Sequence, residues 1–217
     1  MADQRLIAVY GAASSLFIKR GYANSQVSQI AAEANIATGT IYNLFASKKS
    51  ILHFVLLSTF DRKYLGGNIT LPVKEVDTEL IIQHLSLVIE DLFSKIEESV
   101  QSFSDMLSVL FDSIASYHVA FSIINDNKSA LDEIESKYRT YVNNLYKLIE
   151  KNLQNYIEQG EVRKVELPRL HIRNILEGIT WWAMYLPYQD SGKKIPVSQS
   201  KDIALDILKH AYMKKMN

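Results

Sequence analysis

The sequence predicts an all-α protein of about nine helices. Apolar residues recur at intervals of three and four along most of the chain, which is the spacing of one face of an amphipathic helix. No segment shows the sustained alternation of a half-buried strand. Glycine, asparagine and proline stand where the helical patterns stop, as expected for helix ends and turns.

The first helix is expected over residues 3–20. Lys19 and Arg20 lie in its last turn, where they complement the negative end of the helix dipole, and Gly21 supplies a left-handed stop. Its apolar stripe consists of Leu6, Val9, Ala13, Leu16 and Phe17.

Longer helices are expected in the rest of the chain. One begins near Ser47 and continues to Tyr64, where the cluster Gly66-Gly67-Asn68 ends it. Pro168 falls in the first turn of a later helix, where a missing N–H is harmless, and Pro187 ends that helix. The remaining segments are expected over residues 77–98, 102–122, 129–159, 166–186 and 198–215.

The composition excludes several classes of protein. The chain has 217 residues, 47% of them hydrophobic and 22% charged, as in ordinary globular proteins. It has no cysteine, which excludes disulfides, iron–sulfur clusters and thiol nucleophiles. We find no secretory signal at the N-terminus, and no apolar run reaches the roughly 18 residues of a membrane span. We therefore expect a cytoplasmic protein with no membrane partner.

Charge is unevenly distributed along the chain. Residues 1–65 carry seven Lys and Arg against three Asp and Glu, a net charge of +4. The remaining residues carry 17 basic against 21 acidic side chains, a net charge of −4. A basic N-terminal part on an acidic body favours a polyanion as the partner of the first part.

Residues 25–45 form two very short predicted helices around a tight turn. Ser25 can cap the first helix, and the small Ala31 lets the second helix cross close to its backbone. Asn35 is one of the few residues that tolerate the left-handed conformation that such a turn requires.

The second short helix has two different faces. Ile41, Leu44 and Phe45 lie on one face, from which they can pack inward. Hydroxyl and amide groups on the other face can hydrogen-bond base edges in a major groove, and a phenol can reach a phosphate. The residues left on that outward face are Thr38, Thr40, Tyr42 and Asn43.

Two flanking residues fit a role at phosphates. Gly39 lets the backbone at the helix N-terminus approach a phosphate, and Lys48 offers a charge and a backbone amide to the flanking one. The segment therefore predicts DNA binding; the alternative is a plain helical hairpin within a bundle, in which an exposed polar face has no packing purpose.

Residues 5–55 resemble the N-terminal signature of the TetR (tetracycline-repressor) family of transcriptional regulators. The motifs that carry the resemblance are Phe17, Gly21-Tyr22, Val27-x-x-Ile30-Ala31, Gly39-Thr40-Ile41-Tyr42-x-x-Phe45 and Ser47-Lys48. The chain departs from the family pattern at Asn35 in place of a turn glycine, Ala37 in place of a serine N-cap and Leu44 in place of an aromatic or histidine. The missing cap costs about 1 kcal/mol.

The resemblance implies roles for individual residues. It implies that Thr38, Thr40 and Asn43 read bases. It further implies that Ser25, Gln26, Tyr42 and Lys48 hold phosphates.

The resemblance also implies two domains. These are a three-helix DNA-binding domain over residues 1–47 and a larger helical domain for effector binding and dimerisation over residues 48–217. The candidate lining of an effector pocket is His84, Phe111, His118, Tyr141 and Trp181, each of which has ordinary packing as its alternative. The candidate dimer interface, in the last two long helices, is Ile175, Ile179, Trp182, Ile203, Ile207 and Tyr212.

We therefore expect a homodimeric regulator, most simply a repressor, that binds a palindromic double-stranded DNA operator and is released by a small, largely apolar effector. The sequence of the helix-turn-helix is similar to that of family members that regulate fatty-acid metabolism, which suggests a lipid or acyl-CoA effector. Control of drug efflux is an equally open alternative. We expect no cofactor and no metal.

An enzyme and a protein-interaction adaptor are the competing classes. None of the five histidines has an acid three residues before it, so the paired ligands of a ferritin-like di-iron site are missing. We find no zinc-protease motif, phosphate loop or nucleophile elbow. Asp206 and His210 lie one turn apart, which fits a pair on a helix face. An adaptor without DNA binding remains an alternative if Ala37 and Leu44 disable the reading helix.

Overall fold

The computed structural model describes residues 3–99, 102–185 and 195–214. Within these ranges it contains eleven α-helices and no strand, which confirms the all-α prediction. Its β-structure there is limited to two isolated bridges, one between Phe45 and Val73 and one between Val162 and Met213.

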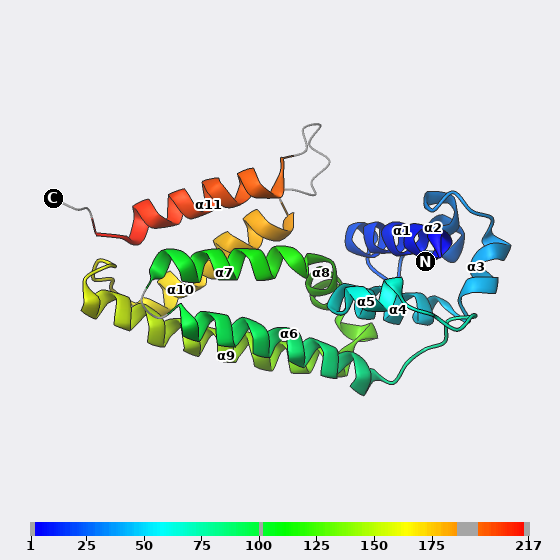
Figure 1. The fold of residues 1–217 in the computed structure, drawn as a ribbon, viewed down its shortest axis with the longest axis horizontal. Coiled ribbons are helices and arrows are strands. Elements are labelled where there is room, and N and C mark those ends of the chain that lie inside the picture. Colours follow the sequence, from blue (N-terminus) through cyan, green and yellow to red (C-terminus); the bar gives the residue numbers. More distant parts are fainter. Residues whose placement is uncertain (1–2, 100–101, 186–194, 215–217) are drawn as a thin grey trace. The chain divides into compact units, whose positions relative to one another are not determined.

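Five helices precede residue 70, shown from blue to cyan in Figure 1. The expected helix from Ser47 to Tyr64 is broken at Asp61, whose carboxylate accepts a hydrogen bond from the Lys63 N–H at 2.9 Å and so caps a new helix. The five helices are α1 (Gln4–Arg20), α2 (Val27–Glu33), α3 (Thr38–Leu44), α4 (Lys48–Phe60) and α5 (Arg62–Gly66).

Six further α-helices follow. The expected helix over residues 102–122 is broken at Tyr117, and the helix that begins at Pro168 changes to a π-helical turn at Trp181. The predicted ends at Pro187 and Lys215 lie outside the described residues. The helices are α6 (Thr78–Glu98), α7 (Phe103–Ser116), α8 (His118–Asp126), α9 (Asp132–Gln159), α10 (Pro168–Thr180) and α11 (Val197–Tyr212), with the short turns η1 (Lys128–Ala130) and η2 (Trp181–Tyr185).

The chain divides into two compact units. The first consists of residues 1–88 with 119–138, and the second consists of residues 89–118 with 139–217. The first unit includes α4 and α5, so the boundary between compact units does not coincide with the predicted boundary between DNA-binding and effector-binding domains after residue 47. That functional boundary stays a prediction.

The first unit is built around α4. Every side chain of α4 from Ser50 to Phe60 is buried, so this helix is covered on all sides, and α1 and α5 pack against it. The apolar stripe predicted for α1 is buried as expected. Phe45 contacts Phe54 edge to face, with ring centroids 5.1 Å apart, which attaches the end of α3 to the same core.

The second unit is built around α7, which packs against α10, α11 and η2. Glu161 accepts hydrogen bonds from the Phe103 N–H at 2.9 and 3.0 Å, so its carboxylate satisfies an N–H at the start of α7. The Tyr156 hydroxyl donates to the Ser99 carbonyl at 2.8 Å, and burial raises the pKa of this phenol to about 12.

Among the described residues, no single helix is long and apolar enough to cross a membrane. The bent pair α7 and α8 passes that test by length and composition only.

Candidate nucleic-acid interface

The start of α2 is capped by two glutamines. Gln26 and Gln29 form a reciprocal capping box, in which the Gln26 N–H donates to the Gln29 side chain at 3.0 Å. The prediction that Ser25 caps this helix is wrong. Ser25 is 1% exposed, and its hydroxyl donates to the Gly21 carbonyl at 2.8 Å, with the Leu16 carbonyl also within reach at 3.3 Å. The Ser25 hydroxyl is thus engaged inside the turn between α1 and α2, whereas Gln26 is exposed.

The turn between α2 and α3 depends on Asn35. Asn35 has a φ of 55°, in the left-handed region, as the sequence predicts. The turn is hydrogen-bonded to the backbone of α2, because the Ile36 N–H donates to the Ala31 carbonyl at 3.0 Å. Ala31 is 1% exposed, in agreement with a close helix crossing at this point.

The two faces of α3 differ as predicted. Ile41 and Leu44 are each 1% exposed, and they anchor the helix to the first unit. Tyr42 is 58% exposed, which is high for a large aromatic side chain. Thr38, Gly39 and Asn43 are also exposed, and Thr40 is half-buried. The helix therefore presents one polar surface to solvent and holds its orientation through the opposite face.

The N-terminus of α3 has no side-chain cap. Ala37 occupies the N-cap position in extended conformation, with φ −66° and ψ 143°, and provides no side-chain hydrogen bond. The first N–H groups of the helix therefore have no acceptor from a cap side chain, and a phosphate is one acceptor that suits them.

Lys48 ties α4 to the turn between α1 and α2. Its ammonium donates to the Tyr22 carbonyl at 2.8 Å and to the Ser25 carbonyl at 2.9 Å, and it lies 4.2 Å from the centroid of the Tyr22 ring. Burial lowers the pKa of Lys48. An ammonium has three N–H donors, so one remains for a phosphate after these two bonds. Lys48 thus has a structural role that the sequence pattern does not predict.

Asn127 holds the same turn from a distant part of the chain. Its side-chain oxygen accepts a hydrogen bond from the Tyr22 N–H, and its side-chain nitrogen donates to the Ile123 carbonyl at 2.8 Å. Asn127 is 7% exposed and belongs to the same compact unit as Tyr22. A separation of 105 residues leaves no local sequence signal for this contact.

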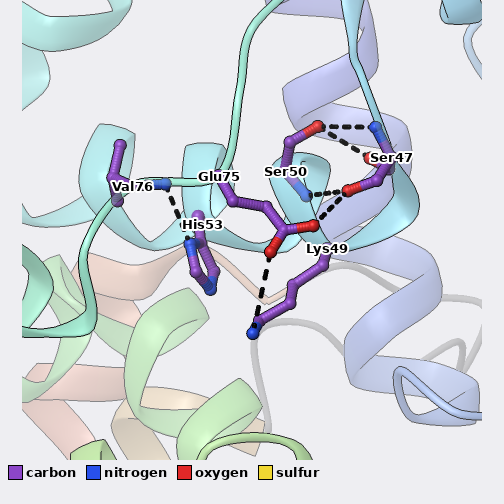
Figure 2. A network of polar contacts seen from close by, with 6 residues as sticks. All are labelled: Ser47, Lys49, Ser50, His53, Glu75 and Val76. Atoms are coloured by element: carbon purple, nitrogen blue, oxygen red, sulfur yellow. Dashed lines mark hydrogen bonds and ion pairs between the residues drawn. The ribbon is translucent and has the colours of Figure 1, made fainter.

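A second polar network, shown in Figure 2, lies at the start of α4. Ser47 and Ser50 form a reciprocal capping box, with the Ser50 N–H donating to the Ser47 hydroxyl at 2.9 Å. The Ser47 hydroxyl donates to the Glu75 carboxylate at 2.8 Å. The Val76 N–H donates to Nδ1 of His53 at 3.3 Å, and burial, followed by the charge of Lys49, lowers the pKa of that histidine. The sequence pattern predicts neither the Glu75 nor the His53 contact.

The comparison with known families identifies the N-terminal part of the chain. Residues 9–55 match the model of bacterial regulatory proteins of the tetR family. This part of the chain is of the TetR type. The matched residues include the whole helix-turn-helix described above, and the family is one of transcriptional regulators rather than enzymes.

One curated relative of the chain is the HTH-type transcriptional regulator HbdR of Aromatoleum sp. (strain CIB). It is 36% identical over 61 residues, a match that spans 28% of this chain and 27% of the relative. The likeness in sequence thus concerns about a quarter of each protein.

Solved structures share the fold over nearly the whole chain. The ketosteroid transcriptional regulator KstR2 of Mycobacterium tuberculosis is 19% identical, with 99% of this chain and 98% of that chain covered and a TM-score of 0.61. The transcriptional regulatory protein RHA5900 is 20% identical, with 94% and 97% covered and a TM-score of 0.61. A transcriptional regulator from Saccharomonospora viridis in complex with choline is 15% identical, with 97% and 98% covered and a TM-score of 0.53.

The candidate pocket residues occupy different environments. Phe111 is fully buried in the second unit, whereas Trp181 is 43% exposed and contacts Trp182 edge to face. His118 and Tyr141 are half-buried in the second unit, and His84 is half-buried in the first. Two cavities in the described residues have other linings: one of about 580 Å³ beside residues 67–76, and one of about 430 Å³ along α9 at Pro168.

The candidate interface residues divide into two groups. Ile203 and Ile207 are 38% and 50% exposed on α11, and Trp182 is half-buried. The other three lie inside the second unit, because they fill the core between α10, α11 and α7, so their side chains do not reach a partner surface. These buried residues are Ile175, Ile179 and Tyr212.

Proposed function

We propose that this TetR-family chain is a homodimeric, DNA-binding transcriptional repressor that holds a palindromic operator in the cytoplasm and releases it when a small, largely apolar effector binds. One observation carries the proposal. Helix α3 buries Ile41 and Leu44 and presents Thr38, Tyr42 and Asn43 to solvent. A short helix held by one face, with hydroxyl and amide groups on the other, fits the major groove.

The resemblance to the TetR family suggests the roles within the site, and the exposure of most of these side chains supports them. We assign base contacts to Thr38, Thr40 and Asn43 and phosphate contacts to Gln26 and Tyr42, with the backbone at Gly39 close to a phosphate. Lys48 contributes its remaining N–H to a phosphate. Ser25 supports the turn between α1 and α2 and contributes no hydroxyl to DNA.

A dimer is supported by the exposed apolar surface of α10 and α11. Leu170 on α10 and Trp181, where α10 passes into η2, are 61% and 43% exposed, and Ile203 and Ile207 on α11 are exposed as well. Ile203 and Ile207 are four residues apart, which places them on one face of α11. One α3 contacts few base pairs, so two half-sites are needed for adequate affinity.

The effector is proposed to bind among the middle helices, with a lipid or acyl-CoA as the first class to test. The candidate contacts Phe111, His118, Tyr141 and Trp181 all belong to the second unit, whereas His84, a separate candidate, belongs to the first. A ligand can release the operator only if it binds the DNA-competent state less tightly than another state.

A salt titration tests the proposal. Full-length protein is titrated into a labelled duplex selected from a random-sequence library, at NaCl concentrations from about 50 to 200 mM. We expect the logarithm of the binding constant to fall linearly with the logarithm of the salt concentration, since phosphate contacts release counterions. Selection of no sequence and absence of a salt slope would assign the chain to the adaptor class instead.

A matched pair of variants locates the binding. Asn43→Ala removes an exposed amide from α3, and Asn143→Ala removes one from α9. We expect only the first to weaken binding to the selected duplex, by roughly ten-fold if the amide contacts a base edge. Equal effects of both variants would contradict the assignment of α3.

A further inference from the structure

A strap of chain, residues 71–76, is hydrogen-bonded to the end of α3 and to α4. Val73 is 3% exposed; its N–H donates to the Leu44 carbonyl at 2.7 Å, and its carbonyl accepts from the Ala46 N–H at 2.9 Å. Three residues further on, the Val76 N–H donates to His53 on α4. The strap is therefore held at two points, one at the end of α3 and one on α4.

Glu75 lies between these two points, and its carboxylate reaches the first turn of α4 (Figure 2). One carboxylate oxygen accepts from the Ser47 hydroxyl at 2.8 Å, and the other lies 3.7 Å from the ammonium of Lys49. The negative charge of Glu75 also contributes, after burial, to the raised pKa of Tyr22. The carboxylate thus lies between a hydroxyl and a lysine at the start of α4.

The groups that Glu75 occupies are of the kinds that bind phosphate oxygens. A hydroxyl and a lysine at the start of α4 suit a phosphate oxygen as well as a carboxylate oxygen. The Glu75 and Lys49 side chains are 44% and 50% exposed, so DNA can approach them. A phosphate that arrives there meets a negative charge and a lysine that is already partly neutralised.

We infer that Glu75 is an intramolecular competitor of the DNA backbone, which occupies Ser47 and Lys49 and lowers the affinity of the helix-turn-helix for any duplex. This inference rests on the proposed DNA binding and adds an affinity-determining residue to it. Because the carboxylate is carried by the strap, movement of residues 71–76 changes the charge that DNA meets at α4.

Glu75→Gln separates charge from structure. A glutamine side-chain oxygen still accepts from the Ser47 hydroxyl, so the capping arrangement is kept while the negative charge is removed. Glu79→Gln is the matched control, since it makes the same chemical change at an exposed position in the first turn of α6. Both variants raise the net charge equally.

The measurement is fluorescence anisotropy with full-length protein and a mixed-sequence duplex of about three helical turns, over a salt series. We expect Glu75→Gln to bind about two- to five-fold more tightly than the wild type at the lowest salt, the range of an exposed charge interaction. We also expect a salt slope that is steeper by about 0.9 per subunit, because Lys49 becomes available to a phosphate. Glu79→Gln should keep the wild-type slope.

Three outcomes overturn the inference, and they are distinguishable. If the wild type shows no salt-dependent binding to any duplex, the proposed DNA binding fails and the role of Glu75 fails with it. If the wild type binds and Glu75→Gln equals Glu79→Gln in affinity and slope, the role of Glu75 alone is lost. If Glu75→Gln binds more weakly than the wild type while its thermal unfolding is unchanged, Glu75 assists DNA binding instead of opposing it.

Discussion

Asn35 is the residue on which the helix-turn-helix geometry depends most. Its φ of 55° costs a side chain with a Cβ roughly 1–2 kcal/mol, and asparagine tolerates this region better than alanine. We expect Asn35→Ala to lower the free energy of unfolding by about 1 kcal/mol and Asn35→Gly to leave it unchanged or raised. Urea denaturation of the two variants checks this; equal stability of the alanine and glycine variants would contradict it.

His53 makes stability depend on pH. Burial is the main cause of its lowered pKa, so the folded protein holds this imidazole neutral while the unfolded chain protonates it near pH 6.5. Above that pH the histidine contributes no pH dependence. As pH falls from 7 to 5 the unfolded state binds the proton first, and stability is lost. We expect thermal melts of His53→Gln to lose less stability than the wild type over that range, and equal losses would show that other groups dominate.

Residue patterns near the turn predict part of the site, and contacts over long distances supply the rest. The left-handed Asn35 and the outward face of α3 follow from local spacing and conformational preference. The positions of Lys48, Glu75 and Asn127 depend on partners 23 to 105 residues away, and no local pattern encodes them. For Ser25 the prediction fails for a different reason: a serine before a short helix suggests a cap, but its hydroxyl donates to the Gly21 carbonyl in the preceding turn.

At the scale of elements, the N-terminus of α3 lacks a side-chain cap that a single substitution can supply. Ala37 provides no cap, so Ala37→Ser should add about 1 kcal/mol to the free energy of unfolding. Ala46→Ser is the control, since Ala46 is exposed and lies outside any N-cap position. Thermal melts compare them; an equal rise in both variants would show that the gain does not come from capping.

The sequence predicts which segments are helical better than it predicts where a helix is interrupted. The periodicity predicts α1, α6 and α9 closely. The breaks at Asp61 and Tyr117 fall within continuous apolar patterns that contain neither proline nor glycine, although at Asp61 the side chain caps the helix that follows.

At the scale of the molecule, the dimer that we propose through α10 and α11 would set the geometry in which two α3 helices meet one duplex. Ile207 is 50% exposed on α11, so Ile207→Asp should convert the dimer to monomer at micromolar concentration without loss of the fold. Leu87→Asp, at a 64% exposed position on α6, is the control. Light scattering after size exclusion measures the mass of each variant. A dimer that persists in Ile207→Asp would show that the interface lies elsewhere.

The most direct test of the proposed role of α3 is binding-site selection from a random duplex library with the wild type and with the triple variant Thr38→Ala, Thr40→Ala, Asn43→Ala. If α3 reads bases, the wild type will select a palindrome with half-sites about one helical turn apart. The triple variant will then bind DNA with little sequence preference, through the phosphate contacts that it keeps. Selection of the same palindrome with the same strength by both proteins would show that the base contacts lie elsewhere.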